Sequence, residues 1–425
     1  MVRAWVVWSA GVLAYVVGVM HRTTFGVSGI DAAARFDVAP TVLSSFVVLQ
    51  VVVYAAMQIP AGVMLDRFGS RVLIASGAAI MAAGQLTLAM TESLPLAIGA
   101  RAVVGVGDAL TFISVLRLVP QWFAPRRVPL VTQLTGILGQ IGQILSAVPF
   151  LALLYGPGWS VAFGSAAALG VLIVVLVLAV VRNAPPGLAV VAEKVTLRDT
   201  ARSIRDVWFR PGTRLGFFSH LGTQFSITTF ALMWGLPYLT SGQGLSSGAA
   251  GGLLSLSVLS AIVSGIVIGV LTGRYPNRRS WLVLFIMVSN ALMWTVVLML
   301  PERAPVWLLA LLVVVISVGG PGSAVGFDYA RTFNPSANLG TAQGMVNIGG
   351  FLATLLVILA MGFILDAKGG YTFEAFRVAW TVQYVVWAVG IIGVLLSRKR
   401  TRSVTGVTPR TLSEVRERIR RDREG

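Results

Sequence analysis

The stretch 62-GVMLDRFGSR-71 places three charges within six residues, between two long apolar runs. A weaker copy, 269-GVLTGRYPNRR-279, follows about two hundred residues later. When the two copies are aligned, Gly62 falls on Gly269 and Arg67 falls on Arg274. Weak internal repeats between apolar segments are typical of membrane proteins that are built from two related halves. The polar hinge therefore predicts an all-α integral membrane protein with a duplicated architecture.

Composition supports a membrane protein. Of the 425 residues, 56% are hydrophobic and only 12% are charged, and the mean hydropathy is +0.83. Soluble domains carry about 25% charged residues, so most of this surface must face lipid. The formal net charge of +17 does not indicate a nucleic-acid partner, because the basic residues lie in short loops and a terminal tail rather than on one folded face.

A transmembrane helix needs about 20 apolar residues. Twelve stretches qualify, and they are expected at approximately 5–29, 41–65, 71–90, 94–121, 128–155, 159–181, 214–240, 247–271, 280–300, 305–330, 339–365 and 375–397. The first run lacks a basic segment before it and a cleavage site after it, so we interpret it as a span rather than a signal peptide. We predict two pseudo-symmetric six-helix bundles, 1–181 and 214–397, with a basic cytoplasmic connector at 182–213 and a basic cytoplasmic tail at 398–425.

The distribution of basic residues predicts the orientation. Positive charge collects on cytoplasmic loops, and one set of loops here carries nearly all of it. The other set carries only Arg35, Arg303, Lys368 and Arg377. We therefore expect a multi-pass protein of the inner membrane of a bacterium, monomeric, with both termini in the cytoplasm. The connector and the tail each predict a surface helix, and we favour solvated helices over helices that dock on anionic lipid.

The hinge resembles the signature loop between the second and third spans of the major facilitator superfamily, written G-x-x-x-D-R-x-G-R-R, and only Ser70 departs from it. The resemblance covers about 5–397 and implies alternating access between two bundles. It also implies a latch in which Asp66 faces the N-terminus of a helix in the other bundle, with Gly62, Arg67, Gly69 and Arg71 completing the motif. The second copy has Gly273 at the Asp position, so its latch is weaker or absent. The alternative is a tight turn whose arginines only set the orientation.

Three ionisable residues inside the predicted spans are candidates for function, since charge within a membrane is costly. Arg101 and Asp108 lie seven residues apart, two helical turns, so they share one helix face. Arg22 lies at a similar depth in the first span, and it could converge with Arg101 on one ligand. Arg117, on the opposite side of its helix, is expected to snorkel or to pack between helices.

Polar side chains at helical spacing mark the expected walls of a substrate cavity. The candidates for substrate contact, besides Arg22 and Arg101, are Tyr15, Tyr54, Gln140, Gln224 and Asn347. Each could equally be an interhelical hydrogen bond. The run 317-SVGGPGS-323 predicts a kinked gate at Gly320, Pro321 and Gly322. Near the cytoplasmic end of the same span, we favour a structural ion pair between Asp328 and Arg331 over a coupling site.

Two further stretches, 101-RAVVGVGDA-109 and 20-MHRTTFGVS-28, resemble the anion:cation symporter branch of that superfamily. In that branch two arginines bind a substrate carboxylate and an acid on the fourth span carries the proton. The resemblance therefore implies substrate contacts at Arg22 and Arg101 and proton coupling at Asp108. His21 stands where the branch has Asp, so any second proton site would be a histidine.

The sequence thus predicts a secondary transporter for proton-coupled uptake of a small organic anion, such as a carboxylate or sugar acid. The alternatives are a porter of nitrate or another inorganic anion and an antiporter that exports drugs or metabolites. No convergent nucleophile or cluster of His, Asp and Glu is evident, and Cys is absent. We therefore expect no enzyme activity, no metal and no cofactor. The absence of a phosphate-binding G-x-x-x-x-G-K-[ST] motif argues against ATP as the energy source.

Overall fold

The computed structural model describes residues 2–37, 40–185 and 204–405, and within these ranges every regular element is a helix. The first half of the chain contains α1 (Val2–Val27), α2 (Gly29–Phe36), α3 (Pro40–Met90), α4 (Leu94–Trp122), α5 (Val128–Gly139), α6 (Ile141–Leu145), the π-helix η1 (Ser146–Phe150), α7 (Leu151–Tyr155) and α8 (Trp159–Val180). In the predicted connector and tail, 204–209 and 398–405 are described as helical, and the remainder, in 186–203 and 406–425, lies outside the described residues.

The second half follows the same plan with more interruptions. It contains α10 (Pro211–Thr229), η2 (Phe230–Trp234), α11 (Gly235–Pro237), η3 (Tyr238–Gly242), α12 (Ser247–Arg274), η4 (Pro276–Arg278), α13 (Arg279–Leu298), α14 (Val306–Ser317), α15 (Gly319–Ser323), α16 (Val325–Phe333), η5 (Ser336–Asn338), α17 (Leu339–Ala367), α18 (Phe373–Ala379), η6 (Trp380–Val382) and α19 (Gln383–Thr405). Most of the short 3₁₀ and π turns contain or adjoin Gly or Pro, whereas η6 contains neither.

Ten helical stretches of the described chain are long and apolar enough to cross a membrane. The sequence predicted twelve, and two features of the fold account for the difference. First, α3 runs without a loop through the predicted spans 41–65 and 71–90, and it bends at Gly69, where φ is 77°. Second, the span predicted at 214–240 corresponds to α10 through η3, and α10 is rich in buried polar residues such as Ser219, His220 and Thr223. Because α10 packs inside the protein, its surface can carry polar side chains, and these give it a lower hydropathy than a lipid-facing helix has.

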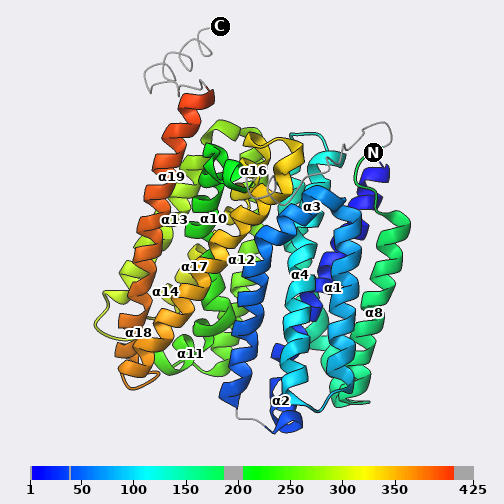
Figure 1. Ribbon diagram of the computed structural model, residues 1–425. Helices are drawn as coiled ribbons and strands as arrows, with labels where there is room; N and C mark the ends of the chain where they lie inside the picture. The colour runs from blue at the N-terminus through cyan, green and yellow to red at the C-terminus, as the bar shows by residue number, and fades with distance from the viewer. Residues whose placement is uncertain (1, 38–39, 186–203, 406–425) are drawn as a thin grey trace, which may run out of the picture.

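The helices form two side-by-side bundles, one from each half of the chain (Figure 1). The first turn of α1 and the last turns of α19 lie at the same end of the molecule, together with the bend of α3 and helix α16. We call this the terminus-bearing end and the opposite one, where α2, α11 and α18 lie, the far end. Each bundle has its own apolar core, and in the second bundle Trp294 and Trp380 stack with ring centroids 4.3 Å apart. Large apolar side chains also cover the outside, as lipid requires.

The two bundles meet through glycines near the terminus-bearing end. A Cβ on Gly62 of α3 would lie 2.5 Å from the carbonyl oxygen of Gly340 on α17. In the repeat-related contact, a Cβ on Gly269 of α12 would lie 3.0 Å from the Cα of Leu130 on α5. Small residues allow helix backbones to approach this closely. The two halves of the molecule are therefore closed against each other at this end, along both of the equivalent helix pairs.

Candidate functional site

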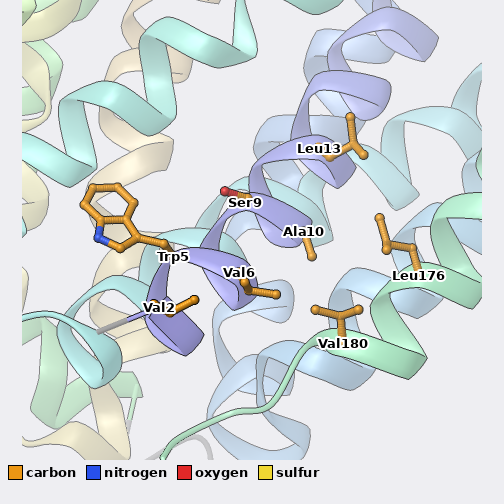
Figure 2. Close-up of a pocket in the computed structure, with 8 residues that line it drawn as sticks. All are labelled: Val2, Trp5, Val6, Ser9, Ala10, Leu13, Leu176 and Val180. Atoms are coloured by element: carbon orange, nitrogen blue, oxygen red, sulfur yellow. The ribbon is translucent and has the colours of Figure 1, made fainter.

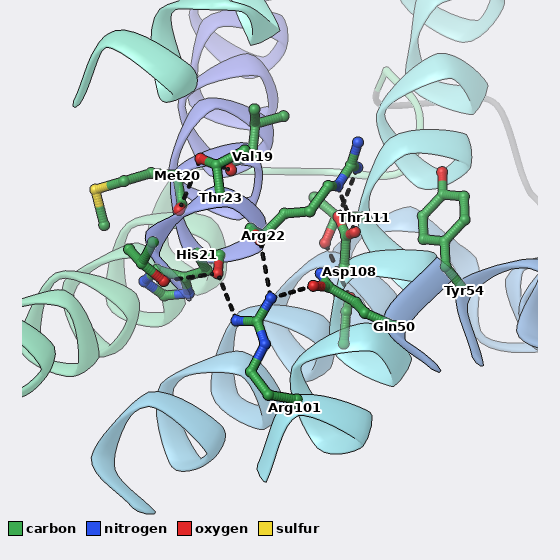
Figure 3. A network of polar contacts seen from close by, with 12 residues as sticks. Val19, Met20, His21, Arg22, Thr23, Gln50, Tyr54, Arg101, Asp108 and Thr111 are labelled. Atoms are coloured by element: carbon green, nitrogen blue, oxygen red, sulfur yellow. Dashed lines mark hydrogen bonds and ion pairs between the residues drawn. The ribbon is translucent and has the colours of Figure 1, made fainter. Parts of the chain in front are cut away.

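Arg22 and Asp108 form a bidentate ion pair between α1 and α4 (Figure 3). Arg22 Nε donates to Asp108 Oδ2 at 2.6 Å and Arg22 Nη2 donates to Asp108 Oδ1 at 2.8 Å. The Asp108 side chain is only 1% exposed, whereas that of Arg22 is 29% exposed. The carboxylate is thus enclosed and the guanidinium is reachable. Two parallel N–H···O bonds are the strongest way to hold a carboxylate, and a substrate carboxylate would need the same two N–H groups.

Arg101 lies beside this pair without contacting Asp108 through a hydrogen bond. Its Nη2 donates to the carbonyl oxygen of Arg22 at 3.0 Å and to Gln50 Oε1, and its Nη1 donates to the carbonyl oxygen of His21 at 3.4 Å. Its guanidinium is 5.0 Å from the ring centroid of Phe25, and the residue is 1% exposed. The hydrogen bonds to Asp108 come from Arg22, and Arg101 interacts with this carboxylate only electrostatically. Arg101 instead holds the backbone of α1 from which Arg22 projects.

Aromatic and amide side chains link this pair to the second bundle. The guanidinium of Arg22 lies 5.2 Å from the ring centroid of Tyr54 on α3. Asn347 Nδ2, on α17, donates to the Tyr54 hydroxyl at 3.1 Å and to Gln58 Oε1 at 2.7 Å. Tyr15 lies close enough to Arg22 and Asp108 to interact electrostatically with both. Five of the predicted site residues, Tyr15, Arg22, Tyr54, Asp108 and Asn347, therefore form one contiguous group that crosses the bundle interface.

Other predicted site residues lie outside that group. His21 is fully buried, and its Nε2 bonds the carbonyl oxygen of Ala166 on α8 at 2.9 Å, so its ring faces away from Asp108. Gln140 is exposed at the junction of α5 and α6, where it bonds Gln143. Gln224 Oε1, on α10, accepts a hydrogen bond from Ser323 at 2.7 Å. Proton coupling by His21 and substrate contacts by these two glutamines remain predictions.

Asp66 faces the N-terminus of α17 in the other bundle, as the sequence led us to expect. Its Oδ1 accepts from the amide of Gly340 and its Oδ2 accepts from the amide of Thr341, each at 2.7 Å. The Thr341 hydroxyl also donates to Oδ2 at 2.7 Å. The free amides at a helix N-terminus attract negative charge. Arg117 of α4 forms an ion pair with Asp66 and donates to the carbonyl oxygen of Ser336 at 3.1 Å, so it packs between helices rather than snorkelling.

The remaining hinge residues fasten the bend of α3 to its own bundle. The amide of Arg71 donates to Asn183 Oδ1 at 2.9 Å, and its guanidinium donates to the carbonyl oxygen of Leu178 on α8. Gly69 has a positive φ, and the Asn183 side chain occupies the space that a Cβ would need. Arg67 is exposed and lies over the ring of Phe68. Asp66 is thus presented to α17 by a rigid turn.

The latch gives a testable expectation. We expect Asp66→Asn to open the terminus-bearing end, because it removes the charge that binds the α17 amides and leaves Arg117 buried without its carboxylate. The chain has no native Cys, so Ala342→Cys, at a position buried between the bundles, supplies a unique reporter. Its labelling by a maleimide should accelerate about tenfold in the Asp66→Asn background, as expected for the loss of one charge-assisted bond.

Asp206→Asn is the matched control, since Asp206 is exposed in the helical segment 204–209. It should leave the labelling rate of Ala342→Cys unchanged. Equal labelling rates in the wild-type and Asp66→Asn backgrounds would rule out a latch at this position.

The predicted gate lies where the tenth apolar run is interrupted. α14 ends at Ser317, α15 covers Gly319–Ser323 and α16 begins at Val325. Gln133 of the first bundle donates its Nε2 to the carbonyl oxygen of Pro321 at 2.8 Å, so the segment that includes Gly320 and Gly322 touches the opposite bundle. Nearby, Arg331 pairs with Asp328 at 3.2 Å. This contact confirms the ion pair, and the gating role remains a prediction.

A groove of about 520 Å³ lies between α1 and α8 (Figure 2). It is lined by Val2, Trp5, Val6, Ser9, Ala10, Leu13, Leu176 and Val180. Apart from one serine, these side chains are apolar, and several of them are exposed on the outside of the bundle. Such a lining suits hydrocarbon, not an anion, so this groove is not the substrate site.

Sequence reasoning missed two partners that complete the site. Arg117 was not assigned to the latch, although Asp66 and Arg117 have opposite charges at the same end of neighbouring spans. Gln50, which accepts from Arg101, was not among the predicted site residues. No signal in the sequence distinguishes it from the other glutamines, because its importance comes from the helix that it faces.

Comparison with known proteins identifies the relatives of this chain. The model of the Major Facilitator Superfamily matches residues 11–289 and 216–423. The "Probable galactarate/D-glucarate transporter GarP" of Escherichia coli strain K12 is 20% identical over 384 residues, covering 81% of this chain and 84% of that protein. Two solved structures share the fold. One is a bacterial homologue of the iron transporter ferroportin (TM-score 0.73, 16% identity, 92% of this chain and 98% of the other). The other is the proton:xylose symporter XylE, with a TM-score of 0.67 and 14% identity; the match covers 94% of this chain and 96% of that chain.

Proposed function

This chain belongs to the major facilitator superfamily, and on that basis we propose that it is a proton-coupled symporter that takes up a small organic anion. The family consists of membrane transporters, so the chain is a multi-pass transporter and not an enzyme. The finer assignment rests chiefly on the bidentate pair between Arg22 and Asp108. We further propose that the two termini are cytoplasmic in a bacterial inner membrane, as the distribution of basic residues favours.

The pair supplies a mechanism for coupling. Asp108 occupies the two N–H groups of Arg22 that a substrate carboxylate would use, so the anion and the ionised Asp108 compete for one guanidinium. A proton on Asp108 removes its charge and weakens its hold on Arg22. Binding of the proton therefore favours binding of the anion, and by linkage the anion favours binding of the proton by the same factor. In this mechanism, each substrate carboxylate that binds Arg22 is accompanied by one proton bound to Asp108.

We assign Arg22 as the direct ligand of the anion and Arg101 as its support. Arg22 is the more exposed of the two guanidinium groups. Arg101 holds the carbonyl oxygens of His21 and Arg22, which places its positive charge within reach of the same anion while it fixes the end of α1. Tyr54 and Asn347 connect the site across the bundles, so a substrate held there contacts both halves of the molecule.

Alternating access follows from the contacts at the terminus-bearing end. With Asp66 bound to α17, and with Gly62 against Gly340, the bundles are closed on that side. We propose that substrate enters from the far end in this arrangement. Once Asp108 is protonated and the anion is on Arg22, the net charge carried by the site equals that of the original ion pair, and the bundles rock about the site to release both inward.

A counterflow assay on the purified protein in liposomes tests this function. Galactarate, D-glucarate, gluconate, nitrate and xylose would each be loaded inside, and uptake of the same labelled compound would be measured. The name of the GarP relative supports sugar acids as the first probes. We expect counterflow with at least one of these sugar acids and none with xylose. Counterflow of nitrate alone, or of xylose, would contradict an organic-anion symporter.

A further inference from the structure

Arg398, near the end of α19, is buried without a hydrogen-bond partner. It is 8% exposed, and its Nε has no acceptor. Within the described part of the chain it forms no hydrogen bond or ion pair. Arg101, Arg117 and Arg279 are buried to a similar degree, and each of them donates to oxygen atoms of the protein. A guanidinium carries five N–H donors and is costly to bury unpaired. Among residues 2–37, 40–185 and 204–405, no side chain or carbonyl group supplies an acceptor for Arg398.

The neighbours of Arg398 orient it and add positive charge. Its guanidinium lies 4.3 Å from the ring centroid of Trp281, in the first turn of α13. Stacking on an indole fixes the plane of the guanidinium and leaves the N–H groups at its edge free to bind in that plane. Arg402, one turn further along α19, and Tyr329 of α16 interact with it electrostatically. No carboxylate is among these neighbours within the described residues, and their combined positive charge favours an anionic acceptor.

The surface next to Arg398 is apolar and faces outward. Trp281 is 61% exposed, Phe285 on the same helix is 70% exposed, and Leu396 on α19 is 63% exposed. Helices α13 and α19 pack against each other, and α19 lies at the outer edge of the second bundle, with its last turns at the terminus-bearing end (Figure 1). In a membrane protein this flank is covered by acyl chains, and its last turns reach the level of the headgroups.

We propose that Arg398, Trp281 and Arg402 form a binding site for the phosphate group of an anionic phospholipid. A planar guanidinium donates two parallel bonds to phosphate oxygens, which would satisfy the unpaired donors of Arg398. The acyl chains attached to that phosphate would run along Trp281, Phe285 and Leu396. A soluble phosphate would satisfy the same donors but would leave this apolar flank unused, so the arrangement favours a lipid.

Native mass spectrometry of the full-length protein in detergent, with phosphatidylglycerol as the probe, tests the proposal. We expect Arg398→Gln to weaken the tightest-bound phosphatidylglycerol about tenfold, as the loss of a charge-assisted contact predicts. Trp281→Leu, a change on the lipid-facing surface, should weaken binding in the same direction. Arg398→Lys should give an intermediate loss, because it keeps the charge without the planar fork. If one of these three variants fails to fold, the other two still test the site.

Lys399→Gln is the matched control, since it removes the same charge one residue away on the exposed side of α19. It should change phosphatidylglycerol affinity less than about threefold, the scale of a general surface effect. Equal binding by the wild type, Arg398→Gln and Trp281→Leu would overturn the site. An equally large effect of Lys399→Gln would also overturn it, because it would reduce the interaction to net charge. Inorganic phosphate that displaces phosphatidylglycerol at equal concentration would overturn the assignment to a lipid.

Discussion

The Asp108→Asn variant is expected to lose proton-driven accumulation of the substrate while retaining exchange of substrate for substrate. The amide keeps the size of the carboxyl group and remains next to Arg22, but it cannot take up a proton in the pH range of transport. Without competition from an ionised Asp108, the anion should bind Arg22 with an affinity that no longer depends on pH. Wild-type binding should weaken as pH rises, because the anion needs the protonated Asp108.

Two measurements on proteoliposomes decide this. Uptake driven by an imposed pH gradient should fall to the level of empty liposomes, and counterflow without a gradient should persist. Glu374→Gln is the control, because Glu374 is an exposed carboxylate whose partner is Arg377, and it should change neither measurement. Intact gradient-driven accumulation in Asp108→Asn would show that the coupling proton is carried elsewhere.

Arg22→Ala is expected to have the largest effect on binding, a loss of at least about a hundredfold in substrate affinity. Truncating one partner of a hydrogen-bonded charge pair between a protein and its ligand typically costs about 2–5 kcal/mol of binding free energy, part of which comes from the charge that is left unpaired. Here the variant removes the ligand of the anion and also leaves Asp108 enclosed as an uncompensated carboxylate. Arg22→Lys should be intermediate, since an ammonium keeps the charge but cannot form the bidentate contact.

Equilibrium binding of the counterflow substrate, measured calorimetrically on purified protein, gives the result directly. Arg3→Ala provides the matched control: it lies on the same helix α1, is exposed, and removes the same charge. It should bind the substrate as the wild type does. Should Arg22→Ala retain wild-type affinity, the anion site would have to be placed elsewhere, and the competition with Asp108 would no longer explain coupling.

Most of the fold could be predicted from patterns that lie within single helices. Apolar runs of membrane length located the helices, and the hinge at 62–71 located the bend of α3. The expected position of Asp66 opposite a helix N-terminus was found at α17. The count of twelve spans was predicted less well. Helix α10 is rich in polar residues that are buried against other helices instead of facing lipid, so its hydropathy is low for a span.

The site was predicted less completely, and the arginines show why. Spacing placed Arg101 and Asp108 on one face of the same helix, and Arg22 at a similar depth in the first span. In the structure, Arg22 reaches Asp108 from α1, whereas Arg101 turns to the carbonyl oxygens of His21 and Arg22. Helical periodicity relates residues within an element, but it does not say how two elements are rotated toward each other.

By itself, the sequence determined that the chain is a duplicated helical membrane protein with four costly charges, Arg22, Arg101, Asp108 and Arg117, in the spans of its first half. Hydrophobicity and helical periodicity are local properties, and a linear pattern records them fully. Only the tertiary structure decided that Asp108 belongs to Arg22 and that Arg117 joins Asp66 in the latch, and it alone shows that the Arg398 Nε finds no acceptor among the described residues. Pairing depends on the packing of helices far apart in the chain, and side-chain reach of a few ångströms selects one partner from several of equal charge.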